Sequence, residues 1–298
     1  MQPNAQAILK SMLFVPGDSE KKLAKGQTTA AAALVLDLED SVSIDRIGVA
    51  RGMVKEYLAS HANRSKQQLW VRINPLATAL ALPDLVGIVA GVPDGILLPK
   101  IESAHDIALL DHYLTALEQR EGIAAGSIGI IPVATETPQA MFSVGTYRDV
   151  SPRLVGLTWG AEDLSTAVGA SSNRLENGEY EFTYQLARAM CLLGANAAGV
   201  QAIDTINADF RDSALLEREV KASRRAGFTG KLAIHPDQIE VINTGYSPDE
   251  AELKHATAIV AAFERAGGAG AVQLEGKMID KPHLTQALRV IAMARGDA

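Results

Sequence analysis

Two carboxylates, each placed just after a short apolar run, are the residues of this sequence best suited to chemistry. Glu136 follows the run 130–133, Asp163 follows the run 154–158, and a helix-start signal comes after each acid. Apolar runs of this length predict buried strands, and acids at the same end of two successive parallel strands lie close together. Mg²⁺ accepts one or two carboxylates, completed by water and substrate. The alternative is that both are ordinary helix N-terminal acids, stabilised by the helix dipole.

The elements that would position these acids alternate along the chain as strand and helix. We expect eight strands, at Met12–Val15, Leu34–Leu38, Leu69–Ile73, Gly95–Leu98, Gly129–Val133, Leu154–Thr158, Ala197–Gln201 and Lys231–Ile234. Helices are expected between them, at Asp45–Ser60, Leu82–Ala90, Ser103–Arg120, Glu181–Leu193 and Asp212–Ala226. Eight such units favour an α/β fold of the (β/α)₈ TIM-barrel type over an open nucleotide-binding sheet, because no glycine-rich phosphate motif follows the first strand.

The pattern changes after the last expected strand. Pro248–Ala266 predicts a helix, Gly267–Gly270 a flexible joint, Ala271–Leu274 a short strand and His283–Ala294 a final helix. We therefore expect a catalytic barrel over residues 1–245 and a C-terminal helical extension over residues 246–298. The extension is too short for an independent domain, so we interpret it as a flap that covers a barrel mouth, its own or a neighbour's.

Composition excludes several classes of function. The formal net charge of −7, with no block of Lys or Arg, argues against nucleic acid or an anionic membrane as the main partner. No apolar run is long enough to span a bilayer. The single cysteine, Cys191, lies in an apolar helix-like run, where a buried hydrophobe is the expected role and no disulfide framework is available. We expect a cytoplasmic protein.

Arg72 is the first of three further residues at strand ends that could contact a ligand. It ends an otherwise apolar strand, where its guanidinium can grip a carboxylate through two hydrogen bonds. The alternative partner is the acidic group Asp37, Glu39 and Asp40 after the second strand, and both pairings can occur in one barrel mouth.

Lys100 and His235 each allow two interpretations. Lys100 could form a Schiff base if its pKa were depressed, but Glu39, Asp40 or Glu102 could pair with its ammonium, and we favour a charge partner. His235 could be a general base, or a helix-entry histidine hydrogen-bonded to the backbone. None of the six histidines has metal-ligand spacing.

With these residues in place, the sequence resembles the citrate lyase β-subunit-like family, which includes malyl-CoA and citramalyl-CoA lyases. The resemblance covers nearly the whole chain in seven ordered motifs: Leu13-Phe14-Val15-Pro16-Gly17, Leu36-Asp37-Leu38-Glu39-Asp40-Ser41-Val42, Val71-Arg72-Ile73-Asn74, Leu98-Pro99-Lys100-Ile101-Glu102, Thr135-Glu136-Thr137, Trp159-Gly160-Ala161-Glu162-Asp163-Leu164 and Lys231-Leu232-Ala233-Ile234-His235-Pro236. Each motif is weak alone, and seven in order are specific.

The resemblance implies roles for particular residues. Glu136 and Asp163 would hold Mg²⁺, and Arg72 would bind the carboxylate of a small 2-oxo acid. The 14–25 region and the 231–236 loop would receive the coenzyme A portion of an acyl thioester. The candidates for substrate contact, besides Arg72, are Phe14, Lys25, Asn74 and Lys100.

The C-terminal segment Gly276–His283 resembles an extension that reaches an adjacent subunit's site in several family members. Asp280 would then be the catalytic acid/base, although its place beside Lys281-Pro282 also suits an ordinary helix N-cap.

The function implied is a Mg²⁺-dependent carbon–carbon lyase. It would catalyse reversible Claisen-type cleavage of a 3-hydroxyacyl-CoA, such as malyl-CoA or citramalyl-CoA, to an acyl-CoA and a 2-oxo acid. The alternatives are an acyl-CoA thioesterase on the same scaffold, the β subunit of a citrate lyase complex acting on an acyl-carrier protein, and a class II sugar-acid aldolase that needs no CoA. The family also implies a homotrimer or hexamer.

Overall fold

The structure is a computed structural model, and it describes residues 8–267 and 270–295. Two residues of the predicted joint, 268 and 269, lie outside the described residues. The chain forms two compact units, one made of residues 9–242 and the other containing the residues from 243 onward. No described helix is both long enough and apolar enough to cross a membrane.

The first unit is a (β/α)₈ barrel, which confirms the predicted fold class. Its parallel strands, in the order β5-β4-β3-β2-β1-β8-β7-β6, are β1 (Ser11–Pro16), β2 (Ala33–Asp37), β3 (Gln68–Arg72), β4 (Gly95–Leu98), β5 (Gly129–Pro132), β6 (Gly156–Leu157), β7 (Gln201–Asp204) and β8 (Gly230–Ala233). The parallel bridges Ile130–Leu154 and Val133–Thr158 join the two outer strands of this order. They close the sheet into a barrel.

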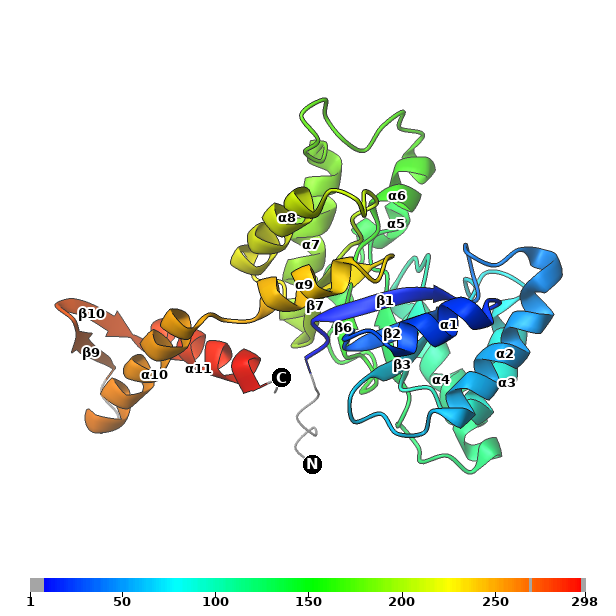
Figure 1. Ribbon diagram of the computed structural model, residues 1–298, viewed down its shortest axis with the longest axis horizontal. Helices are drawn as coiled ribbons and strands as arrows, with labels where there is room; N and C mark the ends of the chain where they lie inside the picture. Colours follow the sequence, from blue (N-terminus) through cyan, green and yellow to red (C-terminus); the bar gives the residue numbers. More distant parts are fainter. Residues whose placement is uncertain (1–7, 268–269, 296–298) are drawn as a thin grey trace. The chain divides into compact units, whose positions relative to one another are not determined.

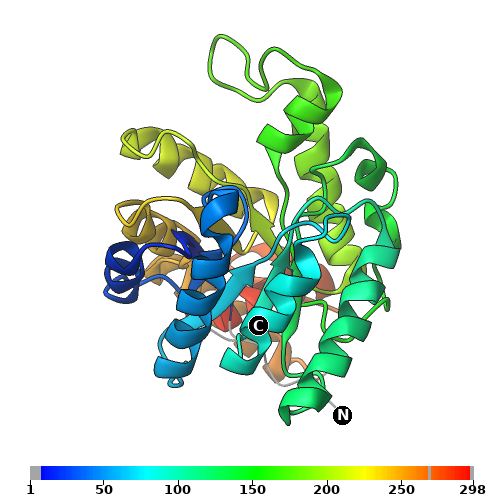
Figure 2. The same cartoon turned by 90° about the vertical axis from the view of Figure 1, so that its right-hand side faces the viewer.

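Helices flank the strands on the outside of the barrel (Figures 1 and 2). They are α1 (Glu20–Gln27), α2 (Ile47–Ser60), α3 (Ala81–Ile88), α4 (Ala104–Glu121), α5 (Pro138–Met141), α6 (Ala161–Val168), α7 (Phe182–Ala198), α8 (Ser213–Ala226) and α9 (Gln238–Tyr246), with single 3₁₀ turns at Ile44–Arg46, Val89–Gly91 and Val144–Thr146. All the strand pairings of the barrel are parallel and at least one helix lies between each strand and the next, so the carboxyl ends of all eight strands open on one face.

The barrel interior is filled by apolar side chains from several strands. Met12, Val35, Trp70, Ile131 and Leu232 belong to one buried cluster. Gly95 makes room for the largest of them, because a Cβ there would lie 2.2 Å from the Trp70 ring. The interior is therefore a packed core, and the only large openings in such a barrel are at its ends.

The seventh strand begins four residues later than predicted. Helix α7 runs on to Ala198 and ends at Gly199, whose φ of +73° is left-handed, so β7 begins only at Gln201. The apolar residues 197–200 that suggested a strand are the last helical turn and its cap. The shift matters for the site, because it makes Asp204 the last residue of β7.

The second unit contains two helices and a hairpin. They are α10 (Glu250–Arg265), β9 (Ala271–Leu274), β10 (Lys277–Asp280) and α11 (Lys281–Arg295), with β9 and β10 antiparallel. The predicted helices and the strand 271–274 are confirmed, whereas the sequence reading missed β10. A small core that includes Ile259, Phe263 and Ile279 holds the unit together.

Candidate active site

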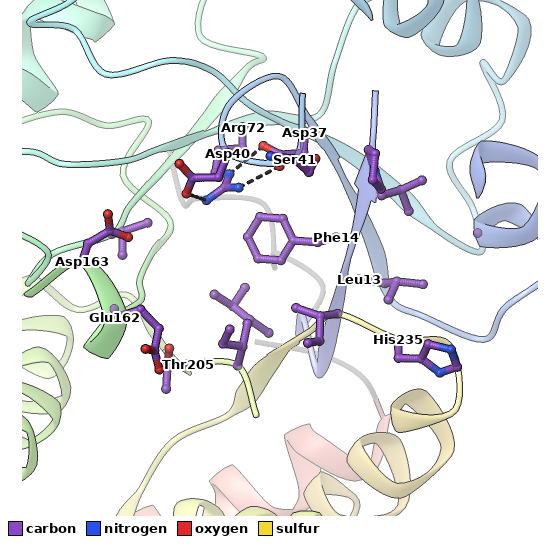
Figure 3. A pocket seen from close by; sticks show the side chains of 18 of the residues that line it. Leu13, Phe14, Asp37, Asp40, Ser41, Arg72, Glu162, Asp163, Thr205 and His235 are labelled. Atoms are coloured by element: carbon purple, nitrogen blue, oxygen red, sulfur yellow. Dashed lines mark hydrogen bonds and ion pairs between the residues drawn. The ribbon is translucent and has the colours of Figure 1, made fainter. Parts of the chain in front are cut away.

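A cavity of about 600 Å³ opens at the carboxyl ends of the barrel strands. Its walls combine apolar residues with charged ones, and Figure 3 shows Arg72 with Asp37 and Asp40 on one side, Asp163 and Glu162 on another, and Phe14 between them. The charged and aromatic lining residues are Phe14, Lys22, Lys25, Asp37, Asp40, Arg72, Glu136, Trp159, Glu162, Asp163 and His235. Five of the predicted site residues, Arg72, Phe14, Lys25, Glu136 and Asp163, therefore line one cavity.

Arg72, the last residue of β3, is held by the acids that follow β2. Its Nε and Nη2 donate to the two carboxylate oxygens of Asp37, each at 2.7 Å, and its Nη1 lies 2.9 Å from Glu39. Burial opposes charge on Asp37, but these hydrogen bonds outweigh it and lower the pKa of that carboxyl. The salt-bridge alternative is thus present, and the guanidinium still lines the cavity.

Phe14 packs against the same guanidinium. The ring centroid lies 4.7 Å from Arg72 Cζ, a cation–π distance, and the ring stands in the middle of the cavity view in Figure 3. Arg72 is therefore fixed on one face by an aromatic ring and at its edge by carboxylates.

Lys100 follows β4 and faces the acids rather than open solvent. Its Nζ lies 2.6 Å from Glu39, 3.4 Å from Asp40 and 3.2 Å from Asp163. Although burial disfavours its charge, these carboxylates raise the pKa of the Lys100 ammonium above its usual range. A Schiff-base lysine needs the opposite shift. The geometry supports the charge-partner interpretation.

Glu136 is the most unusual acid of the cavity. Its side chain is buried and its Oε2 accepts a hydrogen bond of 2.6 Å from the backbone N–H of Lys100. Burial and the neighbouring Asp163 carboxylate raise its pKa to about 8. Gly160 permits this placement, because a Cβ at 160 would lie 2.7 Å from Glu136 Cγ.

Asp163 lies in the first turn of α6 and is about one-third exposed. The helix begins at Ala161, before Asp163 and not after it as the sequence suggested, because the extended Gly160 serves as its N-cap. The helix-dipole interpretation of Asp163 therefore holds, and the residue also lines the cavity beside Glu136.

The pair Glu136 and Asp163 fits a hard divalent cation. Within the described residues no group of three or more His, Cys, Asp or Glu side chains is arranged to hold a metal. Two carboxylates with room beside them are nevertheless a sufficient protein contribution for Mg²⁺, which keeps several water ligands. A buried carboxyl whose pKa is raised by a second carboxylate gains most from such a cation.

Asn74 is not brought to the cavity. Its side-chain amide donates to the carbonyl of Leu38 and to Asp84, both at 2.8 Å, and the side chain is buried. These bonds fasten the chain after β3 to the chain after β2, and so support the segment that carries the acids around Arg72.

Trp159 and Asp204 were not singled out as a pair from the sequence. The indole N–H of Trp159 donates to Asp204 at 2.6 Å, and Arg188 binds the same carboxylate at 2.9 Å. Trp159 lines the cavity and directly precedes the Gly160–Asp163 turn. The available signal was Asp204 itself, an acid that follows an apolar run at the end of the seventh strand, but its pairing with Trp159 was not predicted.

His235 lies at the cavity edge, where its ring stacks on Phe210 with centroids 4.6 Å apart. Its Nδ1 accepts from the backbone N–H of Asp237, which matches the helix-entry interpretation. Cys191 is buried, as predicted.

Asp280, the predicted acid/base, belongs to the second unit. It is the last residue of β10, and its carboxylate contacts the His283 imidazole in the first turn of α11. Both side chains are about half exposed.

Comparison with known proteins places these residues in a family context. A sequence model described as HpcH/HpaI aldolase/citrate lyase matches residues 10–236. The citrate lyase subunit beta of Escherichia coli is 33% identical over 296 residues, which is 99% of this chain and 96% of that protein. The (3S)-malyl-CoA thioesterase of Cereibacter sphaeroides is 32% identical (97% and 95% covered), and the mitochondrial citramalyl-CoA lyase of Homo sapiens is 32% identical (96% and 85%).

A solved structure agrees with the sequence matches. The structure of CitE from Mycobacterium tuberculosis in complex with magnesium, acetoacetate and coenzyme A superposes with a TM-score of 0.78 at 30% identity, covering 98% of this chain and all of that one.

Proposed function

The chain belongs to the HpcH/HpaI aldolase/citrate lyase family, and we propose that within it this protein is a Mg²⁺-dependent carbon–carbon lyase. The proposed substrate is a 3-hydroxyacyl-CoA of the malyl-CoA or citramalyl-CoA type, cleaved reversibly to an acyl-CoA and a small 2-oxo acid. The relatives named as lyases and the CitE complex with magnesium and coenzyme A support this choice.

One observation carries the proposal: the buried Glu136 and the half-buried Asp163 line the same cavity as Arg72. The two acids offer hard oxygen ligands, and the guanidinium offers a fixed positive charge. A small oxo acid has its carboxylate next to its ketone. It can therefore face the cation of the acid pair and the guanidinium together.

In the cleavage direction the hydroxyl proton of the substrate leaves, the C2–C3 bond breaks, and its electrons form the enolate of the acyl thioester. A bound Mg²⁺ would act as a Lewis acid on the substrate oxygens. Arg72 holds the oxo-acid carboxylate, and its own ion pairs with Asp37 and Glu39 keep it aimed. The enolate then takes a proton at C2, which regenerates a neutral acyl-CoA.

We assign the proton transfers to Asp280 and the coenzyme A portion to the cavity wall that carries Phe14, Lys22, Lys25 and His235. The lysine ammonium groups suit the phosphates of the coenzyme. A positioned carboxylate acting as general acid or base contributes on the order of 10² to 10⁴ in rate. We also propose a homotrimer or hexamer, as the family implies. We propose a cytoplasmic location, because the single cysteine allows no disulfide framework within the chain.

The test is a substrate screen of the purified protein with Mg²⁺ against malyl-CoA, β-methylmalyl-CoA and citramalyl-CoA. The expected result is a 2-oxo acid and an acyl-CoA in equal amounts, with no free thiol, and loss of the activity with a chelator. If the wild-type protein turned over none of the three compounds faster than an Asp163→Asn variant does, the proposal would be contradicted.

A thioesterase is the second candidate, favoured by the 32% identity to (3S)-malyl-CoA thioesterase. The identities to that protein and to the citramalyl-CoA lyase are equal, so similarity alone does not separate them. Free thiol released from malyl-CoA without any 2-oxo acid would identify hydrolysis.

The third candidate is a citrate lyase β subunit, favoured by the 33% identity to the Escherichia coli protein. Such a subunit would work on a thioester of an acyl-carrier protein. Activity on the carrier-bound thioester, with none on the coenzyme A ester, would favour this candidate.

A further inference from the structure

Lys100 is bonded to both of the acids that we assign to Mg²⁺. Its backbone N–H donates to Glu136 at 2.6 Å, and its Nζ lies 3.2 Å from Asp163. The two acids come from different strand ends, β5 and β6, so a residue after β4 ties them together. Lys100 is therefore placed to influence how both acids meet a cation.

The backbone of Lys100 is held in a costly conformation. Its φ of +51° lies in the left-handed region that side chains other than glycine rarely adopt. Such strain persists where the surrounding structure imposes it, and it often occurs at functional sites. Here the conformation directs the N–H at Glu136 while the side chain turns to Asp163 and Glu39.

Around Lys100 there are more carboxylates than cationic side chains. The ion pairs of Arg72 within the described residues are with Asp37, Glu39 and Asp40, and not with Asp163. Lys100 is left as the near cation for Asp163, and it pairs more closely with Glu39, at 2.6 Å. The ammonium can thus leave Asp163 and remain paired with Glu39 and Asp40.

We propose that Lys100 is the internal counter-ion of the metal site: its ammonium neutralises Asp163 in the metal-free protein and moves off it, toward Glu39 and Asp40, when Mg²⁺ binds. The inference rests on the proposed function, because it takes Glu136 and Asp163 as the ligands. Mg²⁺ must then displace the Lys100 ammonium from Asp163 in order to bind. Lys100 is a positioning residue that keeps the two acids together and lowers the affinity for the metal.

Calorimetric titration with Mg²⁺ alone tests this. Lys100→Met removes the charge and keeps the backbone N–H, so we expect Mg²⁺ to bind about threefold to tenfold more tightly, the scale of a partly exposed ion pair. Lys100→Arg keeps the charge and should bind within about twofold of the wild type. Lys221→Met is the matched control, since Lys221 pairs with Glu217 on the exposed surface, and it should change nothing.

Thermal unfolding gives a second readout without activity. Without metal, Lys100→Met should melt below the wild type, and saturating Mg²⁺ should raise its midpoint more than that of the wild type. Equal or weaker Mg²⁺ affinity in Lys100→Met, with normal binding by the wild type, would overturn the inference. A wild type that binds no Mg²⁺, or a Glu136→Gln variant that binds it normally, would instead overturn the metal site of the proposed function.

Crystal structures of the wild-type protein with and without Mg²⁺ need no variant to fold. The expected result is that the separation of Lys100 Nζ from Asp163, 3.2 Å here, opens beyond ion-pair distance in the Mg²⁺ form while the contact with Glu39 stays. An unchanged Lys100–Asp163 pair beside bound Mg²⁺ would overturn the movement.

Discussion

Two buried glutamates of the barrel differ in how their charge is compensated. Glu118, in α4, accepts from two nitrogens of Arg153 at 2.6 and 2.7 Å and from the backbone N–H groups of Gly126 and Ile128. Glu136 accepts one backbone bond, from Lys100, and has the Asp163 carboxylate as a neighbour.

Their pKa shifts differ accordingly. Burial opposes ionisation of both, but at Glu118 the hydrogen bonds from Arg153 outweigh burial and lower the pKa. At Glu136 burial and Asp163 act together and raise the pKa to about 8. Removing the partner of a paired buried acid destabilises a fold, whereas a buried acid with a raised pKa is a candidate for a functional site. The difference makes Glu136, and not Glu118, the candidate for a functional role in this barrel.

The largest expected effect is that of Glu136→Gln on activity. Removing the proposed metal ligand should take away several kcal/mol of Lewis-acid stabilisation, so we expect kcat/KM to fall by about 10³-fold. Stability in the absence of metal should not fall, because the substitution removes a carboxyl whose ionised form is disfavoured. Steady-state kinetics and urea unfolding at pH 7 measure the two effects. If Glu136→Gln were much less stable than the wild type yet fully active, Glu136 would be a structural residue and not a functional one.

The second prediction concerns the other glutamate. Arg153→Met leaves Glu118 buried without its charged partner, and breaking a buried pair in this way costs about 3–5 kcal/mol. The loss should appear in the unfolding free energy from urea titration. kcat per folded molecule should stay at the wild-type value, because Arg153 contacts α4 and the carbonyl of Ile128 and does not line the cavity. A loss below about 1 kcal/mol would mean that Glu118 is not ionised there.

The sequence predicted the barrel well because each strand is a short apolar run followed by a polar turn. It misplaced β7 because the apolar residues 197–200, at and just after the end of α7, resemble the start of a strand until Gly199 is seen to be left-handed. It missed β10 because Lys277–Asp280 has a charged residue at each end and only two apolar residues between them, and its pairing with Ala271–Leu274 is set by the turn between them. Local pattern determines the elements, and their exact limits depend on caps and pairing.

The site was predicted at the level of residue types and only partly at the level of contacts. Strand ends correctly brought Arg72, Glu136 and Asp163 to one cavity. The bond from the Lys100 backbone to Glu136 depends on a left-handed lysine, which no propensity indicates. Asn74 lies in the same sequence motif as Arg72, yet its side-chain amide donates to Asp84, which comes ten residues later in the chain.

The third prediction uses pH to sharpen the comparison. The pKa of Glu118 is lower in the folded protein than its ordinary value of 4.5, so its contribution to stability is present above pH 4.5 and is lost as the pH falls below it. The difference in unfolding free energy between wild type and Arg153→Met should therefore be largest near neutrality and shrink as the pH falls below 4.5. Urea titrations at several pH values measure it. A constant difference would show that packing, and not charge, causes the loss.

The smallest effect compares two helix caps, one next to Glu136 and one at the start of the helix that carries Glu118. Thr137 follows Glu136 and caps α5, and its hydroxyl also donates to the carbonyl of Ile101, next to Lys100. Ser103 caps α4, the helix of Glu118. Thr137→Ala and Ser103→Ala should each lose about 1 kcal/mol of stability. Only Thr137→Ala should also lower kcat/KM, because it loosens the link between Glu136 and the Lys100 turn, and Thr137→Ser should restore both properties. If Ser103→Ala reduced kcat/KM as much as Thr137→Ala, stability alone would explain both variants.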